Sequence, residues 1–179
     1  IAQLKARQIC VVPTLMREVS TFAYDTTPDF FSDPLFTKYA DPKWVADIKD
    51  PAAQAKVKAS ESARRYKAAL EVANRNVKKL SDAGVTIAMG TDTGPAGRFQ
   101  GYFELMELEL MVKAGLTPKQ ALVAATRNAA TCHHIDRDLG TLEASKWADF
   151  VVLNADPLAN ISAVRQIDAV YIAGNKVNR

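Results

Sequence analysis

Cysteine and histidine are scarce in this sequence of 179 residues, which holds two of each. Cys10 and Cys132 lie far apart in apolar surroundings, so we expect buried free thiols rather than a disulfide framework. His133 and His134 are adjacent, and neighbouring side chains at a helix end point in different directions. They therefore do not form the ligand pair of a metal site, which needs a spacing of about three or four residues on one helix face.

Long apolar runs and a charge of one sign are also missing. No apolar run reaches the roughly 18 residues of a membrane-spanning helix. The 23 basic and 20 acidic residues interleave to a net charge of +3, so no basic stripe is present to bind a phosphate backbone. We expect neither a membrane nor a nucleic acid as partner. The composition, 48% hydrophobic and 24% charged, is typical of a globular domain.

The chain begins with IAQLKARQ, which reads as the end of a helix and lacks both an initiating Met and a signal-peptide cleavage site. We therefore expect it to belong to a longer polypeptide with any targeting signal upstream. The localisation stays open: cytoplasmic or, with such a signal, periplasmic or secreted.

The first 130 or so residues alternate between predicted strands and helices. Ile9–Val12 and Val85–Met89 are short apolar runs of the kind found in buried strands. Between them, an apolar stripe predicts a helix over 60–81 that ends at Gly84. Helices are also predicted over 101–114 and, after a capping box at Thr117, over 118–132. This alternation favours a parallel sheet.

Residues 16–60 interrupt this pattern. They hold four prolines and half of the chain's aromatic residues, with weak periodicity. Long irregular loops in compact domains are usually functional or disordered, and disordered segments are poor in aromatics. We expect an ordered aromatic loop that forms a lid, and the alternative is a flap that only packs. After His134 the pattern becomes β-rich, with strands over 149–153 and 169–173 and a hairpin turn at Gly174-Asn175.

Four blocks of sequence resemble a known family: GVTIAMGTDTG (84–94), ELMELELMVKAGLTPKQALVAATRNAA (104–130), LGTLEASKWADFVVLNADPL (139–158) and IDAVYIAGNKV (167–177). In this order they resemble the C-terminal part of metal-dependent amidohydrolases of the imidazolonepropionase-like and Xaa-Pro dipeptidase-like (prolidase-like) branch. The resemblance implies an α/β fold: residues 1–134 as the C-terminal portion of a (β/α)8 TIM barrel, with 9–12 and 85–89 as its last two strands, and 135–179 as the C-terminal strands of a small composite β-sandwich.

The same resemblance implies that Asp92 is a metal ligand and the acceptor of the proton from the attacking water. The reaction would be hydrolysis of a C–N bond in an amide, cyclic amide or dipeptide, with one or two divalent ions, zinc by analogy. The family's other ligands are a His-x-His pair, a bridging Lys or Glu and two further histidines. Neither His133 nor His134 matches them, so those ligands would lie outside this chain, and we expect the chain alone to be inactive.

Residues beside the predicted strand ends are candidates for substrate contact: Thr14, Thr91, Thr93 and Arg98. The Arg98 guanidinium could pair with a substrate carboxylate, and the alternative is a surface arginine. The alternative for Asp92 is a helix cap. Glu104 and Glu107 share a helix face without visible tuning, which favours a solvated or packing role.

Two classes of function follow. The first is part of a hydrolase that acts on a small molecule or dipeptide, completed by an upstream barrel segment or a second chain, and we expect a homo-oligomer. A hydrolase of a nucleobase or a carbamate is a variant of this class. The second is a non-catalytic barrel remnant or subunit that serves as a scaffold or partner-binding module.

Overall fold

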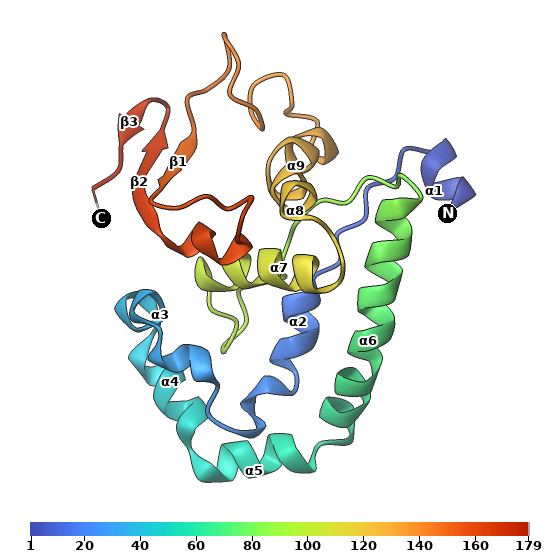
Figure 1. The fold of residues 1–179 in the computed structure, drawn as a ribbon. Coiled ribbons are helices and arrows are strands. Elements are labelled where there is room, and N and C mark those ends of the chain that lie inside the picture. Colours follow the sequence, from blue (N-terminus) through green and yellow to red (C-terminus); the bar gives the residue numbers. More distant parts are fainter. Residues whose placement is uncertain (179) are drawn as a thin grey trace.

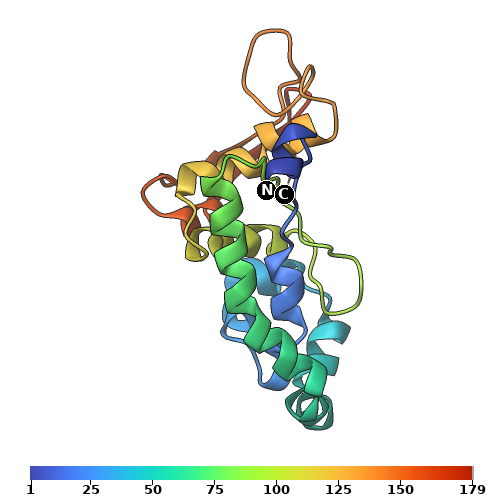
Figure 2. The same cartoon turned by 90° about the vertical axis from the view of Figure 1, so that its right-hand side faces the viewer.

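The computed structural model describes residues 1–178 (Figure 1). Its longest element is helix α6 (Glu61–Asp82), which runs beside α2 (Leu15–Ser20) in both views (Figures 1 and 2). The short helix α1 (Ala2–Ala6) precedes them. The predicted helix over 60–81 is confirmed, as is its end, because Gly84 has the positive φ of 74° expected of a left-handed cap.

The two predicted buried strands, 9–12 and 85–89, meet at a single parallel bridge between Val11 and Ile87. Val11 donates its backbone N–H to Thr86 O at 2.9 Å, and Ala88 donates to Val11 O at 3.0 Å. The parallel direction agrees with the sequence pattern, whereas the predicted full-length strands do not form. Within the described part of the chain, neither segment has a second neighbour that would extend the ladder.

Residues 16–60 fold as successive helices, which corrects the prediction of an irregular loop. The helices are η1 (Ala23–Asp25), η2 (Asp29–Ser32), α3 (Pro34–Tyr39), α4 (Pro42–Lys49) and α5 (Pro51–Ala59). Asp33, Asp41 and Asp50 each accept a backbone N–H at the start of α3, α4 and α5, and a proline follows each as the first helical residue. The prolines therefore begin helices here rather than interrupt them.

Three more helices follow the loop 90–101. They are α7 (Tyr102–Lys113), α8 (Pro118–Ala125) and α9 (Arg127–Cys132). The capping box at Thr117 is confirmed. The single helix predicted over 118–132 is wrong, because Thr126 has non-helical angles (φ −121°, ψ −93°) that separate α8 from α9.

The C-terminal region forms a small antiparallel sheet of β1 (Phe150–Leu153), β2 (Ile167–Ile172) and β3 (Asn175–Lys176), in that order. Phe150 pairs with Tyr171, and their rings stack with centroids 4.5 Å apart. The predicted strands and the Gly174-Asn175 turn are confirmed. Between β1 and β2 lies the short helix η3 (Ile161–Arg165).

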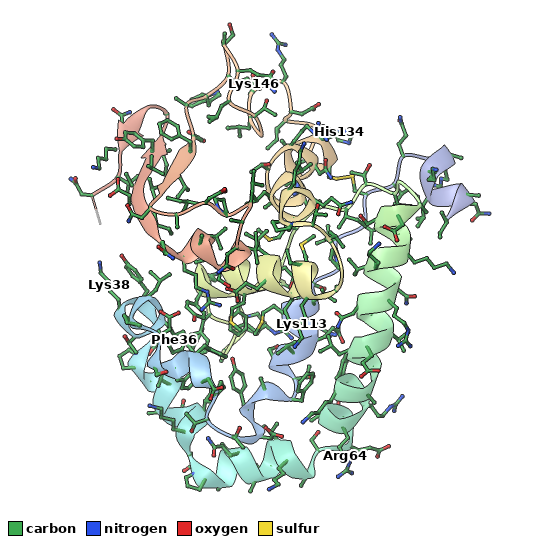
Figure 3. All side chains as sticks on the ribbon, viewed as in Figure 1. Phe36, Lys38, Arg64, Lys113, His134 and Lys146 are labelled. Carbon is green, nitrogen blue, oxygen red and sulfur yellow. A yellow bond between two sulfur atoms is a disulfide. The ribbon has the colours of Figure 1, made fainter. Side chains whose placement is uncertain are left out.

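Two hydrophobic clusters hold the chain together, and the start of α2 belongs to both. Leu15 packs in the first with residues of α6, α7 and α8, such as Val77 and Met111. Met16 packs in the second, which is aromatic and includes Phe36 of α3 (Figure 3) and Phe103 of α7. Leu15 and Met16 are both fully buried, so the first turn of α2 sits at the junction of the two clusters.

Arg165 of η3 joins three elements through its guanidinium. Its Nη1 lies 2.9 Å from Asp33 Oδ2 and also donates to the Tyr102 hydroxyl, and its Nη2 lies 2.5 Å from Glu109 Oε2. The carboxylates come from the start of α3 and from α7. This cluster ties the C-terminal region to the helices of 16–60.

Cys10 and Cys132 form a disulfide (Figure 3), which corrects the expectation of free thiols. Cys10 immediately precedes the bridging residue Val11, and Cys132 is the last residue of α9. The fold brings them together across 122 residues of sequence, a proximity that spacing alone does not indicate. None of the helices in residues 1–178 has both the length and the apolar character needed to cross a membrane.

Candidate active site at the ends of the paired segments

Asp92 lies where the second paired segment ends. The Val11–Ile87 bridge is parallel, so the residues that follow the two segments, Thr14 and Asp92, leave at the same end. The segments approach closely here: a Cβ on Gly90 would lie 2.7 Å from Val12 Cγ1. Asp92 itself has a positive φ of 54°, a conformation that Asp tolerates better than most residues, and its side chain is 61% exposed.

Two arginines approach the Asp92 carboxylate. Arg98 Nη1 donates to Asp92 Oδ2 at 2.8 Å and to the Asp92 backbone oxygen at 2.9 Å. Arg17 Nε, from α2, lies 3.9 Å from the same Oδ2. The structure therefore brings Asp92 and Arg98 together, with the guanidinium on the carboxylate. Pairing of Arg98 with a substrate carboxylate stays a prediction, and it would require the guanidinium to be shared.

Thr91 and Thr93 turn their hydroxyls toward Glu104 of α7. Their Oγ1 atoms lie 2.6 and 2.8 Å from Glu104 Oε1, while Glu104 Oε2 accepts the N–H of Gly101 at 2.6 Å. Glu104 thus fastens both ends of the loop 91–101 and caps α7. Substrate contact by the two threonines stays a prediction, because in this structure they are engaged within the loop.

The same loop is held from its other side by residues of 16–60. Tyr24 donates its hydroxyl to the Gly97 carbonyl, and burial raises the pKa of that phenol above its usual range. Phe99 is buried among aromatic rings, with its centroid 4.7 Å from that of Phe36. The position of the loop that carries Asp92 thus depends on the helical segment.

A cavity of about 490 Å³ lies between this loop and helices α3 and α4. Its wall includes Gly94 and Gly101 of the loop, and its aromatic lining consists of Phe36, Tyr39, Trp44, Phe99 and Tyr102. A second cavity of about 360 Å³ includes Arg98 and residues of α2, α4 and α5. Both spaces are shaped jointly by residues 16–60 and the Asp92 loop.

Glu107 of α7 is a buried carboxylate near the candidate site. It is fully buried, and its two carboxylate oxygens accept the backbone N–H groups of Leu15 and Met16 at 2.9 and 2.6 Å. Burial raises its pKa to about 7, a shift that the two backbone hydrogen bonds oppose and that Glu104 reinforces. The burial of Glu107 excludes the solvated role expected from the sequence and agrees with the alternative, a role in packing.

Thr14, the predicted substrate contact at the first segment's end, has a positive φ of 48° and is the residue before α2. Its side chain makes no capping hydrogen bond to the helix, and Glu107 satisfies the first two N–H groups instead. The structure places Thr14 at the same end as Asp92. A substrate contact of its half-buried side chain stays a prediction.

In the part of the chain that the structure describes, the donors needed for a complete metal centre are not gathered at one place. Over residues 1–178, no group of three or more His, Cys, Asp or Glu side chains could hold an ion. His134 lines a cavity with Cys10 and Val85, at the start of the paired segments and away from Asp92. An exposed carboxylate suits a divalent cation, so Asp92 fits the role of one ligand, and the rest of a first coordination shell would have to come from elsewhere.

Comparisons with known proteins place the chain in a family. A family model described as the amidohydrolase family matches residues 39–177. The chain is 36% identical over 104 residues to the imidazolonepropionase of Deinococcus deserti, covering 56% of this chain and 26% of that protein. It is 39% identical over 90 residues to the ochratoxinase of Aspergillus niger, covering 49% and 18%. A solved putative prolidase from Bifidobacterium longum superposes with a TM-score of 0.65 and 29% identity, covering 95% and 35%.

The chain belongs to the amidohydrolase family. The resemblance to the imidazolonepropionase-like and prolidase-like branch is confirmed by these relatives. The chain spans about a fifth to a quarter of the length of the curated relatives it matches.

Proposed function

We propose that this chain is the part of a metal-dependent hydrolase that supplies Asp92, and that the reaction cleaves a C–N bond in an amide, cyclic amide or dipeptide. The observation that carries the proposal is that the Asp92 carboxylate is exposed and does not cap a helix. Its carboxylate is exposed at the end of a paired segment, and the next helix is capped by Glu104 instead. The names of the relatives, an imidazolonepropionase and a putative prolidase, support the reaction class.

In this proposal the paired segments are the last two strands of a (β/α)8 barrel, residues 1–134 are its C-terminal portion, and 135–179 complete a composite sandwich. Active sites of such barrels lie at the C-terminal ends of the strands, which is where Asp92 stands. The helices of 16–60 act as a lid, because they shape both cavities beside the Asp92 loop. The remaining strands come from an upstream segment or a complementing chain, in a homo-oligomer.

Each residue then has a role. A divalent ion held at this site, zinc by analogy, would supply the activation of a water molecule and the polarisation of the substrate carbonyl. Asp92 would be one of the residues that hold such an ion, and its carboxylate would accept the proton of the attacking water and pass it to the leaving nitrogen. Arg98 holds the carboxylate in place from 2.8 Å, and Thr14, Thr91 and Thr93 border the substrate. The scaffold alternative gives no reason for an exposed carboxylate between two arginines.

The test is Asp92→Asn in the whole natural polypeptide, loaded with Zn²⁺ and assayed with Xaa-Pro dipeptides, N-acyl amino acids and cyclic amides. Loss of the proton acceptor should lower kcat by roughly 10²- to 10⁴-fold. Asp82→Asn is a matched control, because Asp82 is also an exposed carboxylate in an ion pair, with Lys78. It should retain wild-type kcat. Equal activity of the two variants would refute the role of Asp92, and no hydrolysis by the wild type would favour the scaffold.

A further inference from the structure

The carboxylate of Glu107 performs the work of a helix cap from another helix. Helix α2 begins at Leu15, and Thr14 before it offers no side-chain hydrogen bond to the first turn. Glu107 of α7 fills that gap, because each of its oxygens accepts one of the first two N–H groups of α2, at 2.9 and 2.6 Å. The contact joins residues 91 and 92 positions apart in sequence.

Burying the Glu107 carboxylate costs free energy, so its position calls for an explanation other than stability. A carboxylate with no exposed surface loses its hydration, and the hydrogen bonds of two N–H groups offset only part of that loss. Leu15 and Met16 already pack in different hydrophobic clusters. Packing alone therefore holds the start of α2 in the interior, and the bidentate contact adds a fixed direction to the helix.

Helix α2 presents Arg17 to the candidate active site. Arg17 Nη1 lies 2.7 Å from Glu18 and 3.2 Å from the Tyr66 hydroxyl of α6. Its guanidinium carbon lies 5.3 Å from the centroid of the Tyr66 ring. Its Nε is then 3.9 Å from Asp92 Oδ2. Because Arg17 is the third residue of α2, a rotation or shift of the first turn would move this guanidinium relative to Asp92.

We infer that Glu107 is a positioning residue for Asp92: it fixes the first turn of α2, and α2 holds Arg17 near Asp92 Oδ2, the oxygen that Arg98 also contacts. The inference rests on the proposed function, in which Asp92 accepts the proton. Glu107 touches neither substrate nor reacting atoms, and its effect passes through Leu15, Met16 and Arg17.

The test compares Glu107→Gln with Glu109→Gln in the whole polypeptide. The first variant replaces one acceptor oxygen by an NH₂ group that faces a backbone N–H. The second changes a carboxylate on the same helix that pairs with Arg165 instead. In Glu107→Gln, amide hydrogen exchange of the peptide over 14–20 should accelerate roughly tenfold or more, without a change over 61–82. Its kcat should fall roughly tenfold at unchanged KM. Glu109→Gln should leave exchange over 14–20 unchanged.

Arg17→Met removes the contact between α2 and Asp92 but leaves the contact between Glu107 and α2 in place. It should reproduce the roughly tenfold loss of kcat while exchange over 14–20 stays as in the wild type. If Glu107→Gln does not fold, this variant still tests whether Arg17 affects turnover. Wild-type kcat in Arg17→Met, or unchanged exchange over 14–20 in Glu107→Gln, would overturn the inference. If Asp92→Asn abolishes turnover while Glu107→Gln and Arg17→Met keep it, the inference alone fails. If Asp92→Asn keeps full activity, the proposed function fails and the inference fails with it.

Discussion

At Gly90 the two paired segments touch so closely that a single carbon atom matters. A Cβ there would lie 2.7 Å from Val12 Cγ1, and the χ1 angle of a valine is stiff. We predict that Gly90→Ala destabilises the fold by about 1–3 kcal/mol, as overpacking does, and moves the Asp92 loop. Urea unfolding measures the cost.

The origin of this cost can be checked by a second change. Gly90→Ala combined with Val12→Ala removes the atom that clashes, so the double variant should recover most of the stability lost. Val12→Ala alone removes a side chain that is 47% exposed and should have a small effect. Failure of the rescue would assign the cost to the backbone at position 90 instead.

Glu107 should make stability depend on pH. In the folded chain the Glu107 carboxyl has a pKa of about 7, whereas the pKa of a free glutamate carboxyl is 4.5. The unfolded chain therefore binds fewer protons between these values, and the stabilising contribution, fully present below about pH 4.5, is lost as pH rises through 7. From about pH 5 to pH 8, wild type should lose on the order of 1–3 kcal/mol more stability than Glu107→Gln. Parallel pH curves for the two proteins would contradict this assignment.

At the scale of elements, the Asp-Pro steps organise the segment 16–60. Asp50 Oδ1 accepts the N–H of Ala53 at 2.8 Å and caps α5. We predict that Asp50→Ala lowers the free energy of unfolding by about 1 kcal/mol, whereas Asp50→Asn, which keeps an acceptor, changes it little. Thermal unfolding of both variants provides the comparison. Equal destabilisation would point to the charge rather than the cap.

Sequence reasoning succeeded where the signal was local. The stripe through Leu70, Ala73 and Val77 predicted α6, and Thr117 predicted the start of α8. It failed over 16–60, because four prolines were taken as interruptions although Asp33, Asp41 and Asp50 each precede one as a helix cap. It also extended α8 through Thr126, since a local backbone break carries no distinctive residue type.

The candidate site divides in the same way. Asp92 stands on a glycine-flanked turn after an apolar run, and it could be singled out from those residues. Glu107 could not, because its partners are backbone N–H groups in another helix and any residue type offers them. Its neighbours along α7 are ordinary helix residues. Contacts that depend on tertiary packing cannot be identified from the sequence pattern around either residue.

On the scale of the whole molecule, the Cys10–Cys132 disulfide links two residues that are 122 positions apart in sequence. A cross-link of this span restricts the unfolded chain strongly, and the loop-entropy argument gives about 4–5 kcal/mol. We predict that reduction, or Cys10→Ser with Cys132→Ser, lowers the free energy of unfolding by about this amount. Urea unfolding would show the change as a lower midpoint. Titration of accessible thiols under denaturing conditions, before and after reduction, verifies that the bond was present.

That bond also changes what a cut in the backbone means. The chain becomes a closed ring from residue 10 to 132, with two tails, and the ring contains Asp92, Glu107 and the exposed helix α5. A protease that nicks α5 opens the ring but leaves a single covalent molecule. Such a molecule would migrate as one species on a non-reducing gel and separate into two pieces only after a reductant is added, so nicked protein can pass unnoticed through a purification carried out without one.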